Sequence, residues 1–378
     1  MAASSAGDDA GRAALRSPSA VLSGIETFSM RPDKQQTIDI PVRIGLVGLG
    51  GHGRTMQHAA EVASTVQVVA VFDVDEDEAR AAAVRFGCDA AASYEAMLAR
   101  DDLEAVALET PNYLHRAQAE AAFAAGLHVC VAKPIANTVA EGLAMVEAAE
   151  AAGRILMVGH NMRLGRAARA ARRTLDEGRL GQVVSFEAHF SADNTRRLPR
   201  DAWRLRPDQC PLLPVMQLGV HAIDLVHYLD SPIEEVYATA RSVTTPSDVV
   251  DSVVALFRTE RGVTGTLISH YCTPVTFDYR LAGTGGSLRC TPHRYWYRSA
   301  DDTDMHGDGP AETHDFTPHQ LESHVQEMDV FGAAVRTGTA PEIDGWVGLQ
   351  ALAVVEALQR SAETRNPQPV PSFVTRAT

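Results

Sequence analysis

"VRIGLVGLGGHGRT", residues 42–55, is the stretch that decides the fold. A short apolar run leads directly into Gly48, Gly50 and Gly53, and a helix-like run follows. In a GxGxxG turn between a strand and a helix, the first glycine makes the tight turn and the second lets the backbone approach a pyrophosphate. The third glycine lets the helix and the strand pack closely. The stretch predicts the first strand–turn–helix unit of a dinucleotide-binding domain.

An acidic residue supports this interpretation, because GxGxxG alone can arise by chance or mark a purely structural turn. Asp73 lies about 20 residues further on, at the end of the apolar run "VQVVAVFD", where such domains carry a ribose ligand. A carboxylate there accepts hydrogen bonds from a ribose 2′-OH and repels a 2′-phosphate. Asp73 therefore favours NAD over NADP, while Arg54 in the turn keeps NADP possible.

The same strand–helix alternation continues to about residue 162. The further strand-like runs cover residues 103–110, 128–134 and 154–161, and alanine-rich helical runs cover residues 114–125 and 139–152. Continuous apolar strands that alternate with helices indicate a parallel sheet covered on both faces. Residues 41–162 are thus predicted to form an α/β Rossmann domain with a doubly wound parallel sheet.

After residue 162 the rhythm changes to consecutive strands. Five strand-like runs cover residues 182–191, 234–243, 250–259, 263–272 and 277–290, and helical runs cover residues 327–338 and 345–363. Short turns, among them a Gly-Thr-Gly-Gly turn in the last run, favour antiparallel pairing. Residues 163–378 are predicted to form an α+β substrate domain with a largely antiparallel sheet. Residues 1–40 are predicted to be a disordered or loosely packed tail, and residues 300–320 a loop.

Composition excludes several classes of function. The net charge of −14 disfavours binding to nucleic acid or to an anionic membrane, since both need a basic face. Five scattered cysteines without a CxxC pair suit reduced thiols and a cytoplasmic location. No metal site is expected, because the spacing of the histidines in the acidic segment fits no zinc pattern. These histidines are His306, His314, His319 and His324.

Lys133 ends the strand-like run "HVCVAKP". Ligands of open α/β sheets bind at the carboxyl ends of the strands, so Lys133 is expected to face the cofactor. Oxidation of an alcohol by hydride transfer also needs a base for the hydroxyl proton. A lysine can serve if burial and a cationic nicotinamide lower its pKa from ~10.4 toward neutrality. The alternative is a surface lysine whose stem merely covers apolar groups.

Taken together, these motifs resemble the glucose–fructose oxidoreductase/inositol dehydrogenase/rhizopine-catabolism (Gfo/Idh/MocA) family from about residue 42 to residue 363. The resemblance rests on "GLGGHGRT", "TPNYLHRAQAEAAFAAGLHV", the "KP" of "VAKP", "GLAMVEAAEAAGRILMVGHNMR", "LGVHAIDLVHYL" and "EMDVFGAAVRTG". It implies an NAD(P)-dependent oxidoreductase that acts on a sugar, polyol or sugar derivative. It also implies a homo-oligomer that assembles through the C-terminal sheet.

The resemblance assigns roles to individual residues. Lys133 corresponds to the catalytic lysine and His221 to the catalytic or substrate-binding histidine. The expected substrate-binding residues are Gln217, Arg163, Trp203 and Asp224, although Asp224 could instead orient the histidine or its helix. The expected cofactor-binding residues are Gly48, Gly50, Gly51, His52, Gly53, Asp73, Thr110, Pro111, Asn112, His115, Lys133 and Asn161.

Two departures from the family pattern remove carboxylates from this site. Ala132 stands where the family usually has the glutamate of Glu-Lys-Pro, and Gln217 stands where an aspartate commonly precedes the histidine by four positions. The site becomes less negative, and a nearby segment carries the five arginines Arg196, Arg197, Arg200, Arg204 and Arg206. They indicate either a solvated basic loop or bidentate contacts to an anionic sugar.

Two alternatives to a simple dehydrogenase remain open. Some members of the family retain the cofactor and oxidise the substrate only transiently, which enables elimination or glycoside cleavage. Others resemble nonenzymatic ligand sensors. Lys133 and His221 favour an enzyme, whereas the missing acids at positions 132 and 217 favour a sensor.

Overall fold

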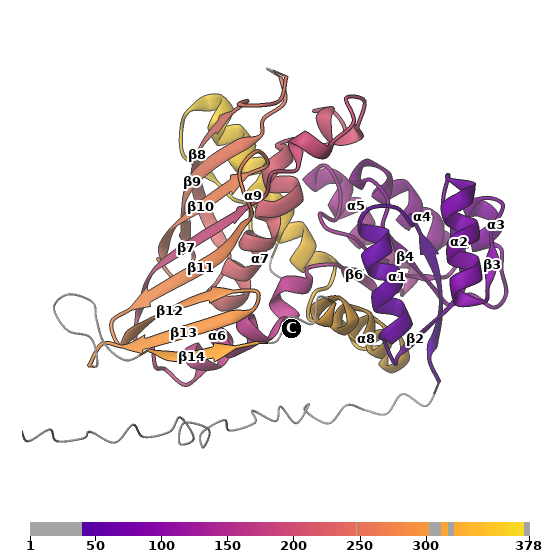
Figure 1. The fold of residues 1–378 in the computed structure, drawn as a ribbon, viewed down its shortest axis with the longest axis horizontal. Helices are drawn as coiled ribbons and strands as arrows, with labels where there is room; N and C mark the ends of the chain where they lie inside the picture. The colour runs from indigo at the N-terminus through magenta and orange to yellow at the C-terminus, as the bar shows by residue number, and fades with distance from the viewer. Residues whose placement is uncertain (1–39, 247, 302–310, 317–320, 374–378) are drawn as a thin grey trace, which may run out of the picture. The chain divides into compact units, whose positions relative to one another are not determined.

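A parallel sheet, sheet A, forms the right-hand part of Figure 1, in the strand order β3-β2-β1-β4-β5-β6. The structure is a computed structural model that describes residues 40–246, 248–301, 311–316 and 321–373. The strands are β1 (Val42–Val47), β2 (Val66–Phe72), β3 (Asp89–Ala90), β4 (Ala105–Leu108), β5 (His128–Val131) and β6 (Leu156–Val158). The strand order changes direction between β1 and β4, because β2 and β3 lie on one side of β1 and β4 to β6 lie on the other. A ligand crevice is therefore expected at the carboxyl ends of β1 and β4.

Helices flank sheet A. They are α1 (His52–Val62), α2 (Glu76–Phe86), α3 (Tyr94–Leu98), α4 (His115–Ala124) and α5 (Val139–Ala152). Their ends follow local sequence signals: Asp75 caps α2, Thr138 forms a capping box with Glu141 on α5, and Gly87 ends α2 in the left-handed region. Every residue of β4 is buried, as a strand covered on both faces requires. The predicted doubly wound domain is confirmed.

The second sheet, sheet B, has the order β14-β13-β12-β11-β7-β10-β9-β8-β15 and is mostly antiparallel, with a parallel pair between β7 and β10. Its strands are β7 (Val183–Ser191), β8 (Ile233–Arg241), β9 (Ser252–Thr259), β10 (Thr264–His270), β11 (Thr276–Gly283), β12 (Gly286–Thr291), β13 (Arg294–Ser299), β14 (Glu312–Asp315) and β15 (Gln368–Pro369). Helices α6 (Arg166–Asp176), α7 (Val220–Leu229) and α9 (Gly345–Thr364) cover the face turned toward sheet A (Figure 1). The predicted α+β architecture is confirmed.

Two local predictions for sheet B had different outcomes. The Gly-Thr-Gly-Gly turn joins β11 to β12, with Gly283 paired to Gly286 as predicted. The loop prediction for residues 300–320 was wrong at residues 312–315, because β14 pairs with β13, which was not predicted at all. Tyr295 and Tyr297 are buried on one face of β13, but the strand is too short for this alternation to stand out. His306, His319 and the predicted N-terminal tail lie outside the described residues.

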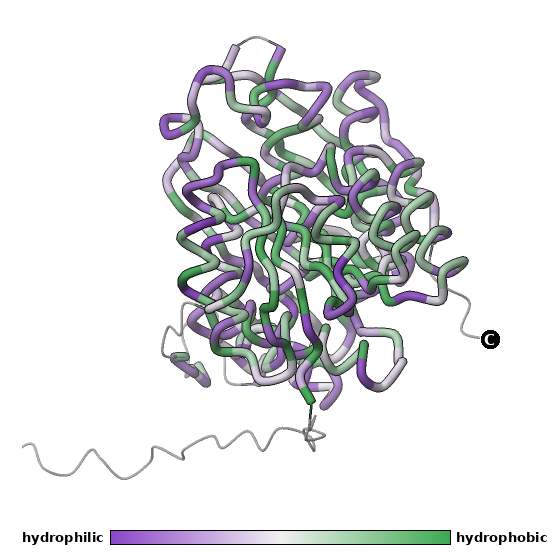
Figure 2. The backbone as a smooth tube through the Cα atoms, turned by 90° about the vertical axis from the view of Figure 1, so that its right-hand side faces the viewer, coloured by the Kyte–Doolittle hydropathy of each residue, from purple (hydrophilic) through white to green (hydrophobic). Residues whose placement is uncertain are grey.

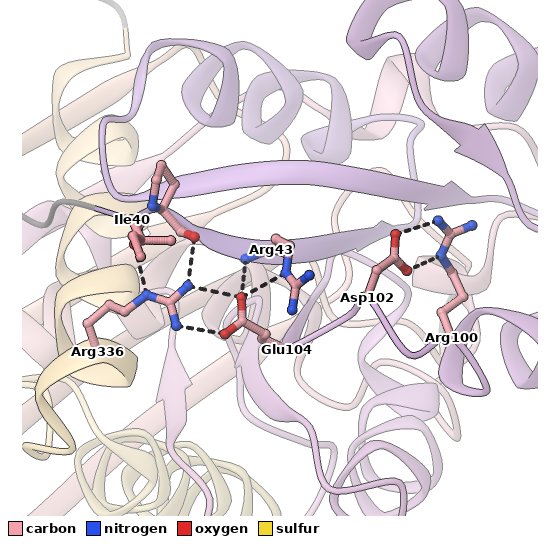
Figure 3. A network of polar contacts seen from close by, with 7 residues as sticks. Ile40, Arg43, Arg100, Asp102, Glu104 and Arg336 are labelled. Atoms are coloured by element: carbon pink, nitrogen blue, oxygen red, sulfur yellow. Dashed lines mark hydrogen bonds and ion pairs between the residues drawn. The ribbon is translucent and has the colours of Figure 1, made fainter.

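A C-terminal helix, α8 (Glu322–Thr337), returns to sheet A. Its Asp329 carboxylate accepts hydrogen bonds from the backbone N–H groups of Ser64 and Thr65 at 2.7 and 3.0 Å. Arg336 donates to Glu104 at 2.6 and 2.9 Å and also to the backbone carbonyls of Ile40 and Pro41 (Figure 3). A segment that lies between strands of the second sheet in the sequence therefore completes the packing of the first sheet, while the division at residue 162 stays a prediction.

The hydrophobic core follows the strands. Figure 2 shows hydrophobic backbone running through the middle of the view and hydrophilic segments toward its edges. Met328 and Phe331 of α8 are fully buried in the same cluster as Ile44 and Leu46 of β1. Among the residues that the structure describes, no helix combines the length and the apolar composition that crossing a bilayer requires.

Candidate active site

A cleft of about 560 Å³ opens at the carboxyl ends of the strands of sheet A. Two groups of residues line it. The strand wall follows β1, β2, β4 and β5 and contains Gly48, Gly50, Gly51, His52, Asp73, Glu109, Thr110, Pro111, Asn112, His115 and Lys133. The loop wall comes from the later part of the chain and contains Trp203, Arg204, Gln217 and Tyr271. The cleft thus brings together most of the predicted cofactor residues and two predicted substrate residues.

The glycine turn has the geometry that a dinucleotide requires. Gly48 has a positive φ of 85°, and a Cβ on Gly53 would lie 2.0 Å from the carbonyl oxygen of Gly48. A Cβ on Gly50, by contrast, would meet nothing within 4 Å, which leaves room for a ligand against the backbone. Helix α1 begins at His52 without a side-chain cap, so its first N–H groups can bind a pyrophosphate. Gly53 supports the turn but does not line the cleft.

Asp73 is fixed at the edge of the cleft. Its Oδ2 accepts a hydrogen bond from the Leu49 N–H at 2.6 Å, and its Oδ1 accepts one from the Asp75 N–H at 2.9 Å. Arg54, the cation that kept NADP possible, forms an ion pair with Glu78. The open glycine turn, the helix N-terminus and a held carboxylate together fit an NAD molecule.

Lys133 lies where β5 reaches the cleft. Its Nζ donates a hydrogen bond to the backbone carbonyl of Gln217 at 2.7 Å. Gln217 belongs to η5 (Val215–Gly219), a π-helical turn, a geometry that often occurs at functional sites. The pKa of Lys133 is lowered to about 8: burial lowers it most, the Arg204 guanidinium also lowers it, and the Glu109 carboxylate opposes both. Neutral amine is therefore accessible near physiological pH.

His221 is buried on α7, with 8% of its surface exposed. Burial lowers its pKa well below the usual value, and Lys133 adds to the effect, so the imidazole is neutral. Its Nδ1 has no hydrogen-bond partner within the described part of the chain. The charge of Lys133 lowers the pKa of His221, but His221 does not line the cleft.

Arg163 and Asp224, both predicted to bind substrate, form a buried ion pair with each other. Two hydrogen bonds join the guanidinium to the carboxylate, and the side chains are 8% and 0% exposed. Arg163 also donates to the Glu342 carbonyl at 3.3 Å and lies over the Tyr228 ring. This geometry suits the orienting alternative for Asp224, and direct contact with substrate stays a prediction.

The five arginines divide into two groups. Arg204 is half-buried: its Nε donates to Oε1 of Gln217 at 3.0 Å, and its guanidinium lies 4.4 Å from the Trp203 ring centroid. The other four are exposed, and Arg196 pairs with Asp193. Gln217 is in turn held by contacts of its Nε2 with Cys210 Sγ at 3.6 Å and Asn112 Oδ1 at 3.5 Å. Only one of the five therefore reaches the cleft.

The remaining predicted cofactor residues have firm structural partners. His115 bridges the carbonyls of Thr110 and Pro134 at 2.9 and 3.0 Å, and burial lowers its pKa. Asn112 bonds to Asn137 and to the carbonyl of Gln209. Asn161 does not line the cleft and donates to Ser323 of α8 at 2.8 Å.

The residues assigned to the site from the sequence did not include Glu109, Tyr271 and Glu327, although residues 109–115 were expected at a strand end that faces the cofactor. Glu109 follows β4 directly, and its side chain is only 2% exposed. A carboxylate immediately after an apolar strand was the available signal, since strand ends face the cleft. Nothing local marks Glu327, which is 1% exposed on α8. Across the described residues, no group of three or more His, Cys, Asp or Glu side chains could hold a metal ion.

Comparison with known proteins gives consistent matches. Residues 42–160 match the model of the oxidoreductase family with an NAD-binding Rossmann fold, and residues 168–289 match the GFO/IDH/MocA C-terminal domain. The chain is 32% identical over 326 residues to D-xylose 1-dehydrogenase (NADP(+)) 2 of Haloferax volcanii, which covers 85% of this chain and 97% of the relative. It is 28% identical over 339 residues to inositol 2-dehydrogenase 1 of Saccharopolyspora erythraea, covering 86% and 95%. An NAD binding oxidoreductase from Klebsiella pneumoniae has the same fold, with a TM-score of 0.80, 22% identity and coverage of 88% and 100%.

Proposed function

The chain belongs to the GFO/IDH/MocA family of NAD(P)-dependent sugar and polyol dehydrogenases, and from this premise we propose that Lys133 is the acid/base of a sugar hydroxyl oxidation or its reverse. The observation that carries the proposal is the place of Lys133. It follows the end of β5 by two residues and lines the cleft together with a glycine turn shaped for a dinucleotide, and its pKa is lowered to about 8.

The residues of the strand wall suit the binding of NAD. The turn from Gly48 to Gly53 would hold the pyrophosphate and Asp73 the ribose hydroxyls. When bound, NAD supplies the hydride acceptor. Lys133 in its neutral form would accept the hydroxyl proton at Nζ, and in the reverse direction its ammonium form would return the proton to the carbonyl oxygen.

The loop wall suits the positioning of the reacting hydroxyl. We assign this role to Gln217, whose backbone carbonyl accepts from Lys133 and whose side chain accepts from Arg204. His221 is assigned to the same hydroxyl as a neutral imidazole, which can both donate and accept a hydrogen bond. Binding of a sugar would have to open a path to this buried ring.

Arg204 supports an anionic sugar as substrate. Within the described part of the chain, its only hydrogen bond runs from Nε to Gln217, so its two terminal nitrogens are available to a carboxylate or a phosphate. A charge-assisted contact of this kind contributes roughly 1.5–3 kcal/mol. We propose that a sugar acid or phosphorylated sugar is used in preference to its neutral counterpart.

The test is a panel of polyols, neutral sugars, uronates and sugar phosphates, with NADH formation followed by absorbance. The expected result is NADH formation that depends on the sugar, with a higher kcat/KM for a uronate than for the matching neutral sugar. Added salt should reduce this advantage. Equal or better turnover of the neutral sugar would contradict the anionic preference alone. Sugar consumption without net NADH would instead favour transient oxidation by a retained cofactor.

The outer face of sheet B is proposed to bind a second copy of the chain. Tyr237 and Leu256 are directly paired on β8 and β9, and with Val254 they are 39, 57 and 44% exposed. The same two strands carry Glu235 and Arg258, so one patch offers apolar surface and both signs of charge, as a self-complementary interface requires. Light scattering should show a dimer or larger oligomer that Leu256→Glu dissociates. A monomeric unmutated protein would contradict this proposal.

A further inference from the structure

The polar groups around Lys133 come from many elements. Among the described residues, seven titratable groups interact electrostatically with it: Glu109 after β4, His160 after β6, Arg204 in η4 (Trp203–Leu205), Cys210, His221 on α7, and His324 and Glu327 on α8. A lysine enclosed by so many groups responds to whichever of them carry charge.

Burial favours the neutral form of five of these groups. It lowers the pKa of His160 to about 4, that of His324 to about 3 and that of His221 well below its usual value. It raises the pKa of the Cys210 thiol to about 12. The pKa of Glu327 is raised well above its usual value, first by burial and then by Glu109. Glu109 and Arg204 act on Lys133 in opposite directions: the carboxylate raises its pKa and the guanidinium lowers it.

Glu109 is held in place from the strand wall. Its Oε2 lies 2.7 Å from Nδ1 of His52, whereas its Oε1 is buried and has no hydrogen-bond partner within the described residues. The backbone keeps it beside the lysine strand, because the Ala132 N–H donates to the Leu108 carbonyl at 2.9 Å. One oxygen of this carboxylate is thus anchored, and the other is buried without a hydrogen-bond partner among the described residues.

Arg204 is held in place from the loop wall. The Trp203 ring supports its guanidinium at 4.4 Å and Gln217 accepts from its Nε at 3.0 Å. Gln217 is also the residue whose carbonyl accepts from Lys133. The two charges therefore reach one amine from separate parts of the chain, each with its own support.

We propose that Glu109 and Arg204 are positioning residues that act through Lys133: the carboxylate stabilises its protonated form, and the guanidinium stabilises its neutral form. This inference rests on the proposed role of Lys133 as the acid/base. Without Glu109 the lysine would be a weaker base, and without Arg204 a smaller fraction of it would be neutral at a given pH. The balance of the two charges sets the pH at which Lys133 exchanges its proton.

The decisive measurement needs neither substrate nor turnover. Lys133 and Lys34 are the only lysines of the chain, so trace acetylation followed by mass spectrometry resolves Lys133 from the rest. The acetylation rate follows the fraction of neutral amine, and its midpoint in a pH series reports the protonation of Lys133. Glu109→Gln should move this midpoint down and Arg204→Gln should move it up, each by on the order of one pH unit. The double variant should lie near the unmutated protein.

Matched variants separate charge from structure. Glu109→Asp and Arg204→Lys keep the charges and should keep the midpoint close to that of the unmutated protein. Glu120→Gln and Arg206→Gln change charged groups that do not line the cleft and should have no effect. Midpoints that do not move, or that move in one direction for both charge-removing variants, would overturn the inference. If Glu109→Gln does not fold, Arg204→Gln against Arg204→Lys carries the test, and equal midpoints for these two would overturn it.

The pH dependence of kcat/KM for sugar oxidation links this result to function. The pH at which kcat/KM falls on the acid side should shift in the same direction as the acetylation midpoint in each variant. Acetylation midpoints that move as expected in a protein without sugar-dependent NADH formation would leave the inference standing and contradict the proposed function. If Lys133→Ala abolishes activity but the acetylation midpoints do not move in the charge-removing variants, the proposed function stands and the inference is overturned.

Discussion

The strand wall and the loop wall of the cleft are built in different ways. In the strand wall the main contacts involve backbone: Gly53 packs on the carbonyl of Gly48, and Asp73 accepts from the N–H of Leu49. In the loop wall side chains support side chains, with Arg204 between Trp203 and Gln217. Contacts that depend on backbone geometry allow few substitutions and suit a ligand that many related chains bind. Contacts made by side chains can be altered by substitution, so the bound ligand can change. The strand wall therefore suits the shared cofactor and the loop wall the individual substrate.

The largest expected effect is at Lys133, which belongs to the strand wall but bonds to Gln217 of the loop wall. Lys133→Ala should lower kcat by roughly 10²–10⁴ because it removes the proton acceptor, while NAD affinity in a calorimetric titration stays nearly unchanged. Lys133→Arg is the matched control: it keeps the charge but cannot become neutral, so it should be as inactive. Near-full activity of the alanine variant would mean that Lys133 takes no part in the proton transfer.

The second largest expected effect is on the free energy of unfolding. Arg163→Met leaves the fully buried Asp224 carboxylate without its partner and should lower the free energy of unfolding by roughly 3–5 kcal/mol. Arg169→Met removes a more exposed ion pair with Glu342 and should cost roughly 1 kcal/mol or less. Urea unfolding of both variants compares the two. Equal losses would mean that burial of the Arg163–Asp224 pair is not what matters.

The pH dependence of oxidation is expected to follow Lys133. Its pKa is lowered to about 8, so neutral amine becomes the main form as the pH rises through 8. Below this value kcat/KM for oxidation should rise about tenfold per pH unit and level off above it, because only the neutral form accepts a proton. Carbonyl reduction should show the reverse trend. If kcat/KM for oxidation does not change between about pH 6 and about pH 8, a base that titrates in this range is contradicted.

The smallest effect is on cofactor choice and belongs to the strand wall alone. Asp73→Ala removes the carboxylate that accepts from a ribose hydroxyl and repels a 2′-phosphate, so the preference for NAD over NADP should narrow by about tenfold. Calorimetric titration of both cofactors measures this change, and the KM of the sugar should stay the same. Tighter binding of NADP than of NAD by the unmutated protein would contradict the prediction.

Local patterns in the sequence were enough to predict much of the site. The spacing of Gly48, Gly50 and Gly53, the distance to Asp73 and the place of Lys133 all follow from strand–turn–helix order, which fixes where strand ends lie. The same reasoning does not reveal partners that are distant along the chain. Asn161 bonds to Ser323 and Arg163 pairs with Asp224, and no local pattern predicts either contact.

What the sequence by itself determined is the doubly wound sheet and the strand wall, because hydrophobic period and glycine spacing act over a few residues. Only the tertiary structure decided which charges surround Lys133. Glu109 after β4, Arg204 in η4 and Glu327 on α8 converge on it from segments that no local pattern relates. Burial then decided which of them stay charged, because the cost of removing a charge from water depends on the whole surrounding fold.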